Sequence, residues 1–565
     1  MVSSRTVGFC LSVLVCSVVC NDYPLVRISD GLLQGAFLKT RNNRKFSGFN
    51  GIPFAKPPVG QLRFQPPVPN DPWEGQLNAT GVHAECPQRD VYRRSPKISG
   101  EEDCLYLNVY TPKLSNFEND LLPVMIWFHG GGLLCGGGNS DWYGPDILLD
   151  RDIVLVVTNY RLGPLGFLAT GDAVVPGNNG LRDQSLALRW IQKNIRKFGG
   201  DPNLVTLFGE SAGGSSSNFH MISPLSRGLF TKAILQSGTT LSPWTFSENQ
   251  ETEKNSRKLA KALNCPTDSS QEMVECLRKV EARTFVELDD IFKVWDYDPM
   301  IPFKPVVEPS EVEDPFMPDH PLNIIKSGKS MDVPIIVGIT SQDGALKNAG
   351  YKNANLLDEF ADRFDELVPV SLFYDRTEKD PQRVTRRLKK FYFGNKRVQD
   401  NIQGITDMYT DGWFFKASDD VARLHTKLYK QPVYFYVFGY NGSVSFSKVF
   451  GGGDEHFGTV HADDLQYLFP VGDGLFPDVK PSESDKRIAK VFTTLWTNFA
   501  KTGNPTPETN ALLPNKWEKY TLENEEYYII DNDNLETRTG VLRNRALFWR
   551  ELINDPLKEG KREEL

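Results

Sequence analysis

The chain has 565 residues, of which 40% are hydrophobic and 24% are charged, an ordinary globular composition. Its formal net charge of −8 provides no basic field for nucleic acid, so no nucleic-acid partner is expected. The sequence contains no zinc-like Cys/His spacing, no P-loop and no Rossmann glycine fingerprint, so the expected chemistry needs no metal and no cofactor.

Residues 1–20 have the pattern of a cleaved signal peptide. Arg5 supplies a short basic region, residues 7–19 are nearly all apolar or small, and the apolar run ends at residues 21–24. A run this short favours a signal peptide over a signal anchor. No later segment reaches the roughly 18 apolar residues that a membrane-spanning helix needs. The sequence therefore predicts a mature protein without a membrane span that is secreted or retained in the lumen.

The cysteines outside the leader fit an oxidising compartment. Short loops predict two disulfides: Cys86 with Cys104, and Cys265 with Cys276. Cys135 is then left over. It is expected to be a buried thiol, or the partner of Cys20 if cleavage falls before that residue.

Two short motifs bear on glycosylation and localisation. Asn78 and Asn441 each begin an N-x-S/T sequon and are candidate glycosylation sites. Residues Arg562, Glu563, Glu564 and Leu565 resemble a KDEL-type retention signal, for which the partner would be a KDEL-type receptor in the ER. A solvated charged tail is an equally good interpretation of these last residues.

Strand and helix signals alternate along the chain. Residues 24–38 predict two short strands, and residues 102–110 lead into another. A helix is expected between residues 180 and 197, with Trp190 and Ile191 on its inner face. Short apolar runs are typical of parallel strands buried on both faces. They occur at 124–128, 153–157, 204–208, 233–236, 333–338 and 433–437. The alternation predicts an α/β fold with a doubly wound, mostly parallel central sheet and long helical insertions.

No repeat or linker divides the chain after the leader. We expect a signal peptide over 1–20, one large domain over 21–557 and a charged tail over 558–565. Within the domain, residues 310–428 are charged and rich in helix signals. We expect this region to form a lid or regulatory part over the functional site.

Residues 209–213 read G-x-S-x-G and organise the functional prediction. They follow the apolar run 204–208, and residues 215–221 can continue as a helix. This is the strand–turn–helix context of a nucleophile elbow, which holds its serine at the tip of a crowded turn. The pattern alone is weak, because an ordinary glycine-rich turn can carry the same residues. Ser211 therefore needs partners elsewhere in the chain.

A serine hydroxyl needs a base to accept its proton and a third group to orient that base. Among the seven histidines, His461 has the best context, after a strand and a glycine-rich loop. His456 is its main competitor, and His425 is expected to be structural because it lies on an amphipathic helix. The acid is expected between the serine and the histidine, and Asp343 lies just past a buried strand. Taken alone, Asp343 before a glycine would be an ordinary turn residue.

Residues 129–132 read H-G-G-G directly after a predicted strand. Consecutive glycines allow backbone N–H groups to converge on one point, as in an esterase oxyanion hole. The expected donors are the amides of Gly131, Gly132 and Ala212, each contributing about 3 kcal/mol to transition-state stabilisation. A flexible glycine loop is the weaker alternative, because the strand fixes where the run begins.

With these motifs in place, the chain resembles the type-B carboxylesterases of the cholinesterase-like α/β-hydrolases, and insect esterases in particular. The resemblance covers nearly the whole mature chain. It rests on the nucleophile signature at 198–214, the second signature at 102–110, and the segments 129–132, 159–163 and 236–238.

The resemblance implies an α/β-hydrolase fold with Ser211 as nucleophile, His461 as general base and Asp343 as the acid. It also implies that Cys86 pairs with Cys104. The family more often has glutamate as the acid, so Glu308 and Asp314 remain alternatives in the same interval. Asp343 is preferred because it directly precedes a glycine, as the family acid does.

The predicted activity is hydrolysis of small to medium apolar carboxylic esters through an acyl-enzyme. A juvenile-hormone esterase-like enzyme is an alternative, although those enzymes typically have glutamine where this chain has Glu210. A non-catalytic adhesion protein of the same fold is a further alternative. It is disfavoured because the triad candidates are present and no transmembrane tail exists. Trp244 is expected either to line the acyl pocket or to lie in the core.

Overall fold

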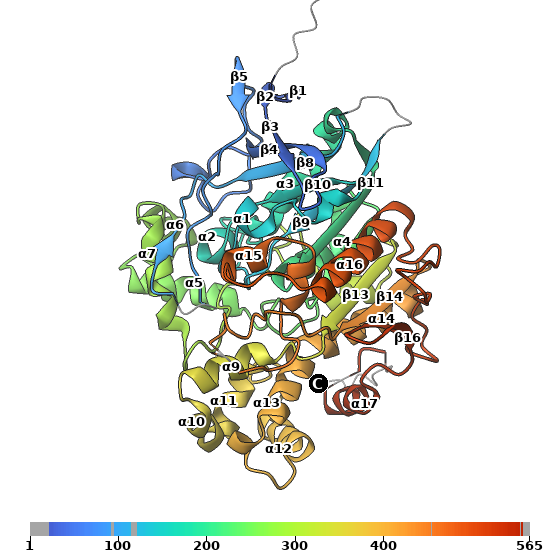
Figure 1. Ribbon diagram of the computed structural model, residues 1–565. Coiled ribbons are helices and arrows are strands. Elements are labelled where there is room, and N and C mark those ends of the chain that lie inside the picture. The colour runs from blue at the N-terminus through green and yellow to red at the C-terminus, as the bar shows by residue number, and fades with distance from the viewer. Residues whose placement is uncertain are drawn as a thin grey trace, which may run out of the picture.

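The computed structural model describes residues 22–91, 95–114, 121–451, 453, 455–553 and 555–557. The predicted signal peptide and the C-terminal tetrapeptide with its retention motif lie outside the described residues. Figure 1 shows a central sheet with helices on its faces and a helical cluster at one end. None of the helices in the described part of the chain is long and apolar enough to cross a membrane.

The central sheet of the described residues has 11 strands. From one edge to the other they are β16 (Leu535–Arg538), β15 (Tyr527–Ile530), β14 (Val433–Phe438), β13 (Ile335–Thr340), β12 (Lys232–Gln236), β11 (Gly200–Glu210), β9 (Leu122–Phe128), β10 (Val154–Thr158), β8 (Tyr106–Thr111), β4 (Lys45–Pro53) and β3 (Ala36–Lys39). Neighbours from β15 through β10 run parallel, and the outer strands pair antiparallel. The predicted mostly parallel sheet is confirmed.

The inner strands are buried on both faces, which explains their continuous apolar sequences. Every residue of β10, β12, β13 and β14 is buried. The helix predicted between 180 and 197 is α3 (Asn179–Asn194), and it does bury Trp190 and Ile191. Helices α4 (Ala212–Ile222) and α16 (Glu483–Thr502) both pack against β9 and β11. They cover these two strands, whose carboxyl ends lie where ligands bind in such sheets.

Smaller elements surround the sheet. A three-stranded sheet joins β1 (Leu25–Arg27), β2 (Leu32–Gln34) and β5 (Gln76–Asn78), and a hairpin joins β6 (Gln88–Arg89) and β7 (Ile98–Ser99). The shorter helices are α1 (Ser140–Tyr143), α2 (Gly163–Phe167), α5 (Glu251–Ala262), α6 (Ser270–Leu277), α7 (Ala282–Glu287), α8 (Pro321–Lys326), α15 (Val471–Leu475) and α17 (Arg543–Leu552).

Most of the region predicted to be helix-rich forms the cluster at the lower end of Figure 1, whereas its last helix, α14 (Lys416–Leu428), packs against β13 and β14. The region includes α9 (Ala345–Asn353), α10 (Leu357–Asp362), α11 (Phe364–Ser371), α12 (Pro381–Tyr392), α13 (Ile402–Tyr409), the π-helix η8 (Thr410–Phe415) and α14. Phe414 in η8 places its ring 4.5 Å from that of His461. The π-helix η8 therefore packs against His461.

Candidate active site

Ser211 lies between the end of β11 and the start of α4, in the strand–turn–helix arrangement that the sequence predicts. Its φ of 56° and ψ of −121° are strained for a residue with a side chain, as such an elbow requires. A Cβ on Gly213 would overlap the carbonyl oxygen of Phe128 in β9, so only glycine fits there. The Ser211 N–H donates to Gln236 O of β12 at 2.8 Å, which fixes the turn against the sheet.

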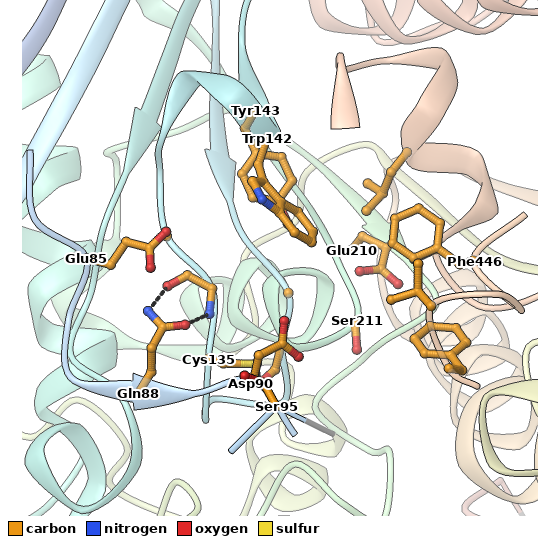
Figure 2. Close-up of a pocket in the computed structure, with 18 of the residues that line it drawn as sticks. Glu85, Gln88, Asp90, Ser95, Cys135, Trp142, Tyr143, Glu210, Ser211 and Phe446 are labelled. Carbon is orange, nitrogen blue, oxygen red and sulfur yellow. Dashed lines mark hydrogen bonds between the residues drawn. The ribbon is translucent and has the colours of Figure 1, made fainter. Parts of the chain in front are cut away.

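A cavity of about 600 Å³ opens at Ser211 (Figure 2). One side is apolar and aromatic, and the other is polar. The apolar side consists of Trp142, Tyr143, Phe446, Val449, Phe450 and Leu465, and the polar side includes Glu85, Gln88, Asp90, Ser95, Lys97 and Ser99. None of the described lining residues comes from 310–428, so this region does not form a lid over the cavity, and a regulatory role for it stays a prediction. Trp244 is also absent from this lining; it is buried, and its indole N–H donates to Trp413 O.

The structure brings His461 and Asp343 together. His461 Nδ1 lies 2.8 Å from Asp343 Oδ1, and Asp343 itself is fully buried just past β13. The other carboxylate oxygen, Oδ2, accepts hydrogen bonds from Ser237 Oγ and from the Thr340 N–H, both at 3.0 Å. Because both oxygens are engaged, the carboxylate is held in one orientation and fixes the plane of the imidazole ring.

Glu210, whose role the sequence did not reveal, contacts the other ring nitrogen of His461. Glu210 Oε1 lies 3.0 Å from His461 Nε2, whereas no hydrogen bond among the described contacts joins Ser211 Oγ to His461. Burial alone would lower the pKa of His461, but the negative charges of Glu210 and Asp343 outweigh it and raise this pKa well above its ordinary value. The only sequence signal for this role was the position of Glu210 beside the nucleophile.

The alternative residues lie elsewhere. His456 is exposed, and His425 is buried in α14, where it stacks on Tyr429. Glu308 forms a buried ion pair with Arg182 and also accepts a hydrogen bond from Asn178, so its carboxylate is used structurally. Asp314 is exposed. Neither acid has a described contact with His461.

The glycine run after β9 lies beside Ser211. Gly130 and Gly131 line the cavity, and a Cβ on Gly130 would come within 3.3 Å of Ser211 Cβ. The loop is closed by hydrogen bonds from the N–H groups of Leu134 and Cys135 to Gly131 O, at 3.0 and 3.1 Å. The N-terminus of α4, which begins at Ala212, adds a partial positive charge near the same point.

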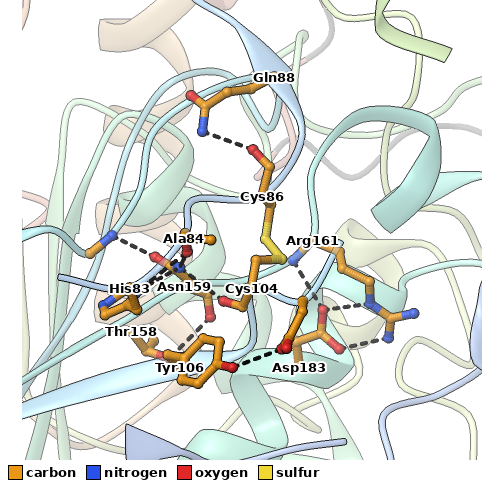
Figure 3. Close-up of a disulfide and its surroundings, with 12 residues drawn as sticks. His83, Ala84, Cys86, Gln88, Cys104, Tyr106, Thr158, Asn159, Arg161 and Asp183 are labelled. Atoms are coloured by element: carbon orange, nitrogen blue, oxygen red, sulfur yellow. Dashed lines mark hydrogen bonds and ion pairs between the residues drawn. A yellow bond between two sulfur atoms is a disulfide. The ribbon is translucent and has the colours of Figure 1, made fainter. Parts of the chain in front are cut away.

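Both predicted disulfides are present. Their Cα–Cα distances are 5.1 Å for Cys86–Cys104 and 5.7 Å for Cys265–Cys276, within the usual range. Figure 3 shows the first of them, with Gln88, Asn159 and Arg161 around it. Cys135 is buried, lines the cavity and forms no disulfide with another described cysteine; Cys20 lies outside the described residues. The sequon residues Asn78 and Asn441 are both exposed.

Known proteins are similar to this chain over most of its length. The model of the Carboxylesterase family matches residues 22–549. The chain is 38% identical to a juvenile hormone esterase of Tribolium castaneum, over 92% of this chain and 90% of that protein. It is also 38% identical to Esterase FE4 of Myzus persicae, over 90% of each chain.

A solved structure is similar as well. The crystal structure of juvenile hormone esterase from Manduca sexta, with OTFP covalently attached, superimposes with a TM-score of 0.83 at 28% identity. The similarity covers 94% of this chain and 99% of that one. The fold, the family match and these relatives lead to one conclusion: the chain belongs to the carboxylesterase family, and it is a carboxylic ester hydrolase.

Proposed function

We propose that this enzyme cleaves esters by nucleophilic catalysis, with Ser211 as nucleophile, His461 as general base and Asp343 as the orienting acid. The observation that carries the proposal is the meeting of four separate segments around one cavity. The elbow serine, the histidine–aspartate pair and the glycine run come from β11, from the loops after β13 and β14, and from the loop after β9.

In the first step, Ser211 Oγ attacks the ester carbonyl carbon while His461 Nε2 takes the serine proton. The carbonyl oxygen becomes an oxyanion that accepts hydrogen bonds from the amides of Gly131, Gly132 and Ala212. His461 then gives the proton to the leaving alcohol, and an acyl-serine remains. Water deacylates the enzyme by the same steps in reverse order, with His461 again acting as base.

Glu210 controls when His461 can act. An imidazolium held between Glu210 and Asp343 has no free electron pair, so it cannot accept the serine proton. The reaction therefore requires a neutral imidazole whose Nε2 turns from Glu210 Oε1, now 3.0 Å away, toward Ser211 Oγ. Catalytic hydrogen bonds of this kind commonly tighten only when substrate is bound. Ester hydrolysis should accordingly be slow at acidic pH.

The cavity supports an apolar ester of small to medium size as substrate. Its volume of about 600 Å³ lies in the usual range for small-molecule sites, and its aromatic side can hold an acyl or alcohol group away from water. A juvenile-hormone ester is the second candidate, favoured by the likeness to the juvenile hormone esterases of Tribolium castaneum and Manduca sexta. Relative kcat/KM on a panel of acyl lengths that includes a hormone ester will separate the two candidates.

The test of the nucleophile is Ser211→Ala, assayed on a small aryl ester. We expect turnover to fall at least about 10⁴-fold, as for other triad nucleophiles, with no change in fold by circular dichroism. The matched control is Ser217→Ala, a buried serine in α4, the helix that follows Ser211; its hydroxyl donates to Gly213 O. Retained turnover in Ser211→Ala would overturn the assignment.

We also propose that the protein enters the secretory pathway. The two disulfides need an oxidising compartment, and the exposed sequons at Asn78 and Asn441 are accessible to glycosylation. Retention through residues 562–565 by a KDEL-type receptor is the alternative to secretion. Removing these four residues separates the two, since retained protein should then appear in the medium.

A further inference from the structure

The oxyanion loop, residues 129–132, packs against a second glycine run, residues 136–138. A Cβ on Gly136 would overlap the ring of His129 and come within 3.0 Å of Gly130 O. Gly136, with φ of +111°, therefore packs directly against the start of the oxyanion loop. Gly130 O belongs to the peptide unit that carries the Gly131 N–H, one of the proposed oxyanion donors, so Gly136 packs directly against that unit.

The side chain of Gln88 forms two hydrogen bonds with the backbone of Gly136. Its Oε1 accepts the Gly136 N–H at 2.6 Å, and its Nε2 donates to Gly136 O at 2.8 Å, so one side chain pairs with the glycine as a neighbouring strand would. Figure 2 shows this pair of bonds at the cavity wall. A flipped amide would set two N–H groups against each other and two oxygens against each other, which fixes the orientation.

The remaining N–H of Gln88 donates to Cys86 O at 3.0 Å. Gln88 therefore links Gly136 to the backbone of a disulfide-bonded cysteine. Asn159 repeats the arrangement on the other half-cystine. Its Nδ2 donates to Cys104 O at 2.9 Å, and its Oδ1 accepts the Gly138 N–H at 2.6 Å. Figure 3 shows both amides beside the Cys86–Cys104 disulfide.

We propose that Gln88, with Asn159, is a positioning residue that transfers the rigidity of the Cys86–Cys104 disulfide to the oxyanion loop. Each amide joins the carbonyl of one half-cystine to the N–H of one glycine in the run 136–138. Gln88 is buried, and its amide oxygen and both amide N–H groups form hydrogen bonds. These hydrogen bonds are therefore part of the packed interior. The disulfide thereby serves transition-state stabilisation as well as stability. The inference rests on the proposed oxyanion hole.

Gln88→Leu tests this role, because leucine has a similar volume and makes none of the hydrogen bonds. Displacing oxyanion donors by a fraction of an ångström should lower kcat about 10- to 100-fold, with KM changed by about twofold or less. Affinity for a trifluoromethyl ketone, which forms an oxyanion on Ser211, should weaken by a factor close to the loss in kcat/KM.

Gln192→Leu is the matched control. Gln192 also donates two hydrogen bonds to backbone carbonyls, of Pro202 at 2.8 Å and Leu229 at 2.9 Å, but it does not line the cavity. We expect it to lose thermal stability without losing kcat. If Gln88→Leu fails to fold, Gln88→Glu replaces it, since this carboxylate still accepts from the Gly136 N–H but cannot donate.

Wild-type kcat and ketone affinity in either folded Gln88 variant would overturn the inference. Such a result leaves the proposed function intact if Ser211→Ala is inactive. Turnover in Ser211→Ala would instead overturn the proposed function itself.

Discussion

The two halves of the site are held by different forces. On the oxyanion side, neutral groups fix the backbone: Gln88 and Asn159 bind the glycine run 136–138 and the carbonyls of the half-cystines. On the histidine side, charges dominate, since His461 lies between Asp343 and Glu210 at 2.8 and 3.0 Å. The geometry of the oxyanion side should be insensitive to pH. The ability of the histidine side to accept a proton should follow the titration of His461.

The histidine side continues into a buried acidic loop. Asp463 accepts hydrogen bonds from the Val460 N–H and from the Phe446 N–H, and so joins the His461 loop to the cavity wall. Asp464 accepts from Gln236, whose carbonyl also binds the Ser211 N–H. Burial raises the pKa of both acids to about 7. Their protonation is thus a second pH-dependent feature of this half.

The largest expected effect is on the charged half. Asp343→Asn keeps the shape of the side chain but removes the charge that orients and stabilises the imidazolium. We expect kcat on a small aryl ester to fall about 10⁴-fold, as for other triads. Asp343→Glu, which restores the carboxylate, should recover part of the activity. An Asn variant within about tenfold of wild type would reassign the acid.

A smaller loss is expected on the neutral half. Gly136→Ala places a methyl group against the His129 ring and should displace the oxyanion loop, lowering kcat by about 100-fold. Gly474→Ala in α15 is the control, because its Cβ would come no closer than 3.8 Å to Asp141 O. Equal kcat values for the two variants would show that the packing behind the loop does not matter for catalysis.

The third prediction is a shift in pH dependence. Only neutral His461 can act as base, so the rate rises with pH through the raised pKa of this histidine. Glu210→Gln removes one of the charges that raise the pKa, and the acid limb of kcat/KM should move to lower pH by about 1 unit or more. Gln88→Leu should lower the rate without moving that limb. An unchanged limb in Glu210→Gln would contradict the role given to Glu210.

The sequence was sufficient for elements with local signals. Continuous apolar runs located the buried parallel strands, and β9, β11 and β13 end next to the glycine run, Ser211 and Asp343, as expected. The short cysteine spacings gave the disulfides.

The pairing of Asp343 with His461 followed from motifs and their order, but contacts between distant segments that carry no motif could not be predicted. Gln88 and Gly136 are 48 residues apart, and nothing in either segment indicates the other. The same reason explains why residues 310–428 do not cover the cavity as a lid: charge and helix signals do not say which surface a helix covers. Phe414 of that region instead packs against the ring of His461.

The most direct test of the account is covalent labelling by a fluorophosphonate followed by peptide mass spectrometry. The phosphorus should bond to Ser211 Oγ with loss of fluoride, which gives one adduct on the peptide that contains residues 209–213. Ser211→Ala should give no adduct, and Ser217→Ala should label like the wild type. An adduct on any other residue, or unlabelled wild-type enzyme that still hydrolyses esters, would contradict the assignment of Ser211 as the nucleophile.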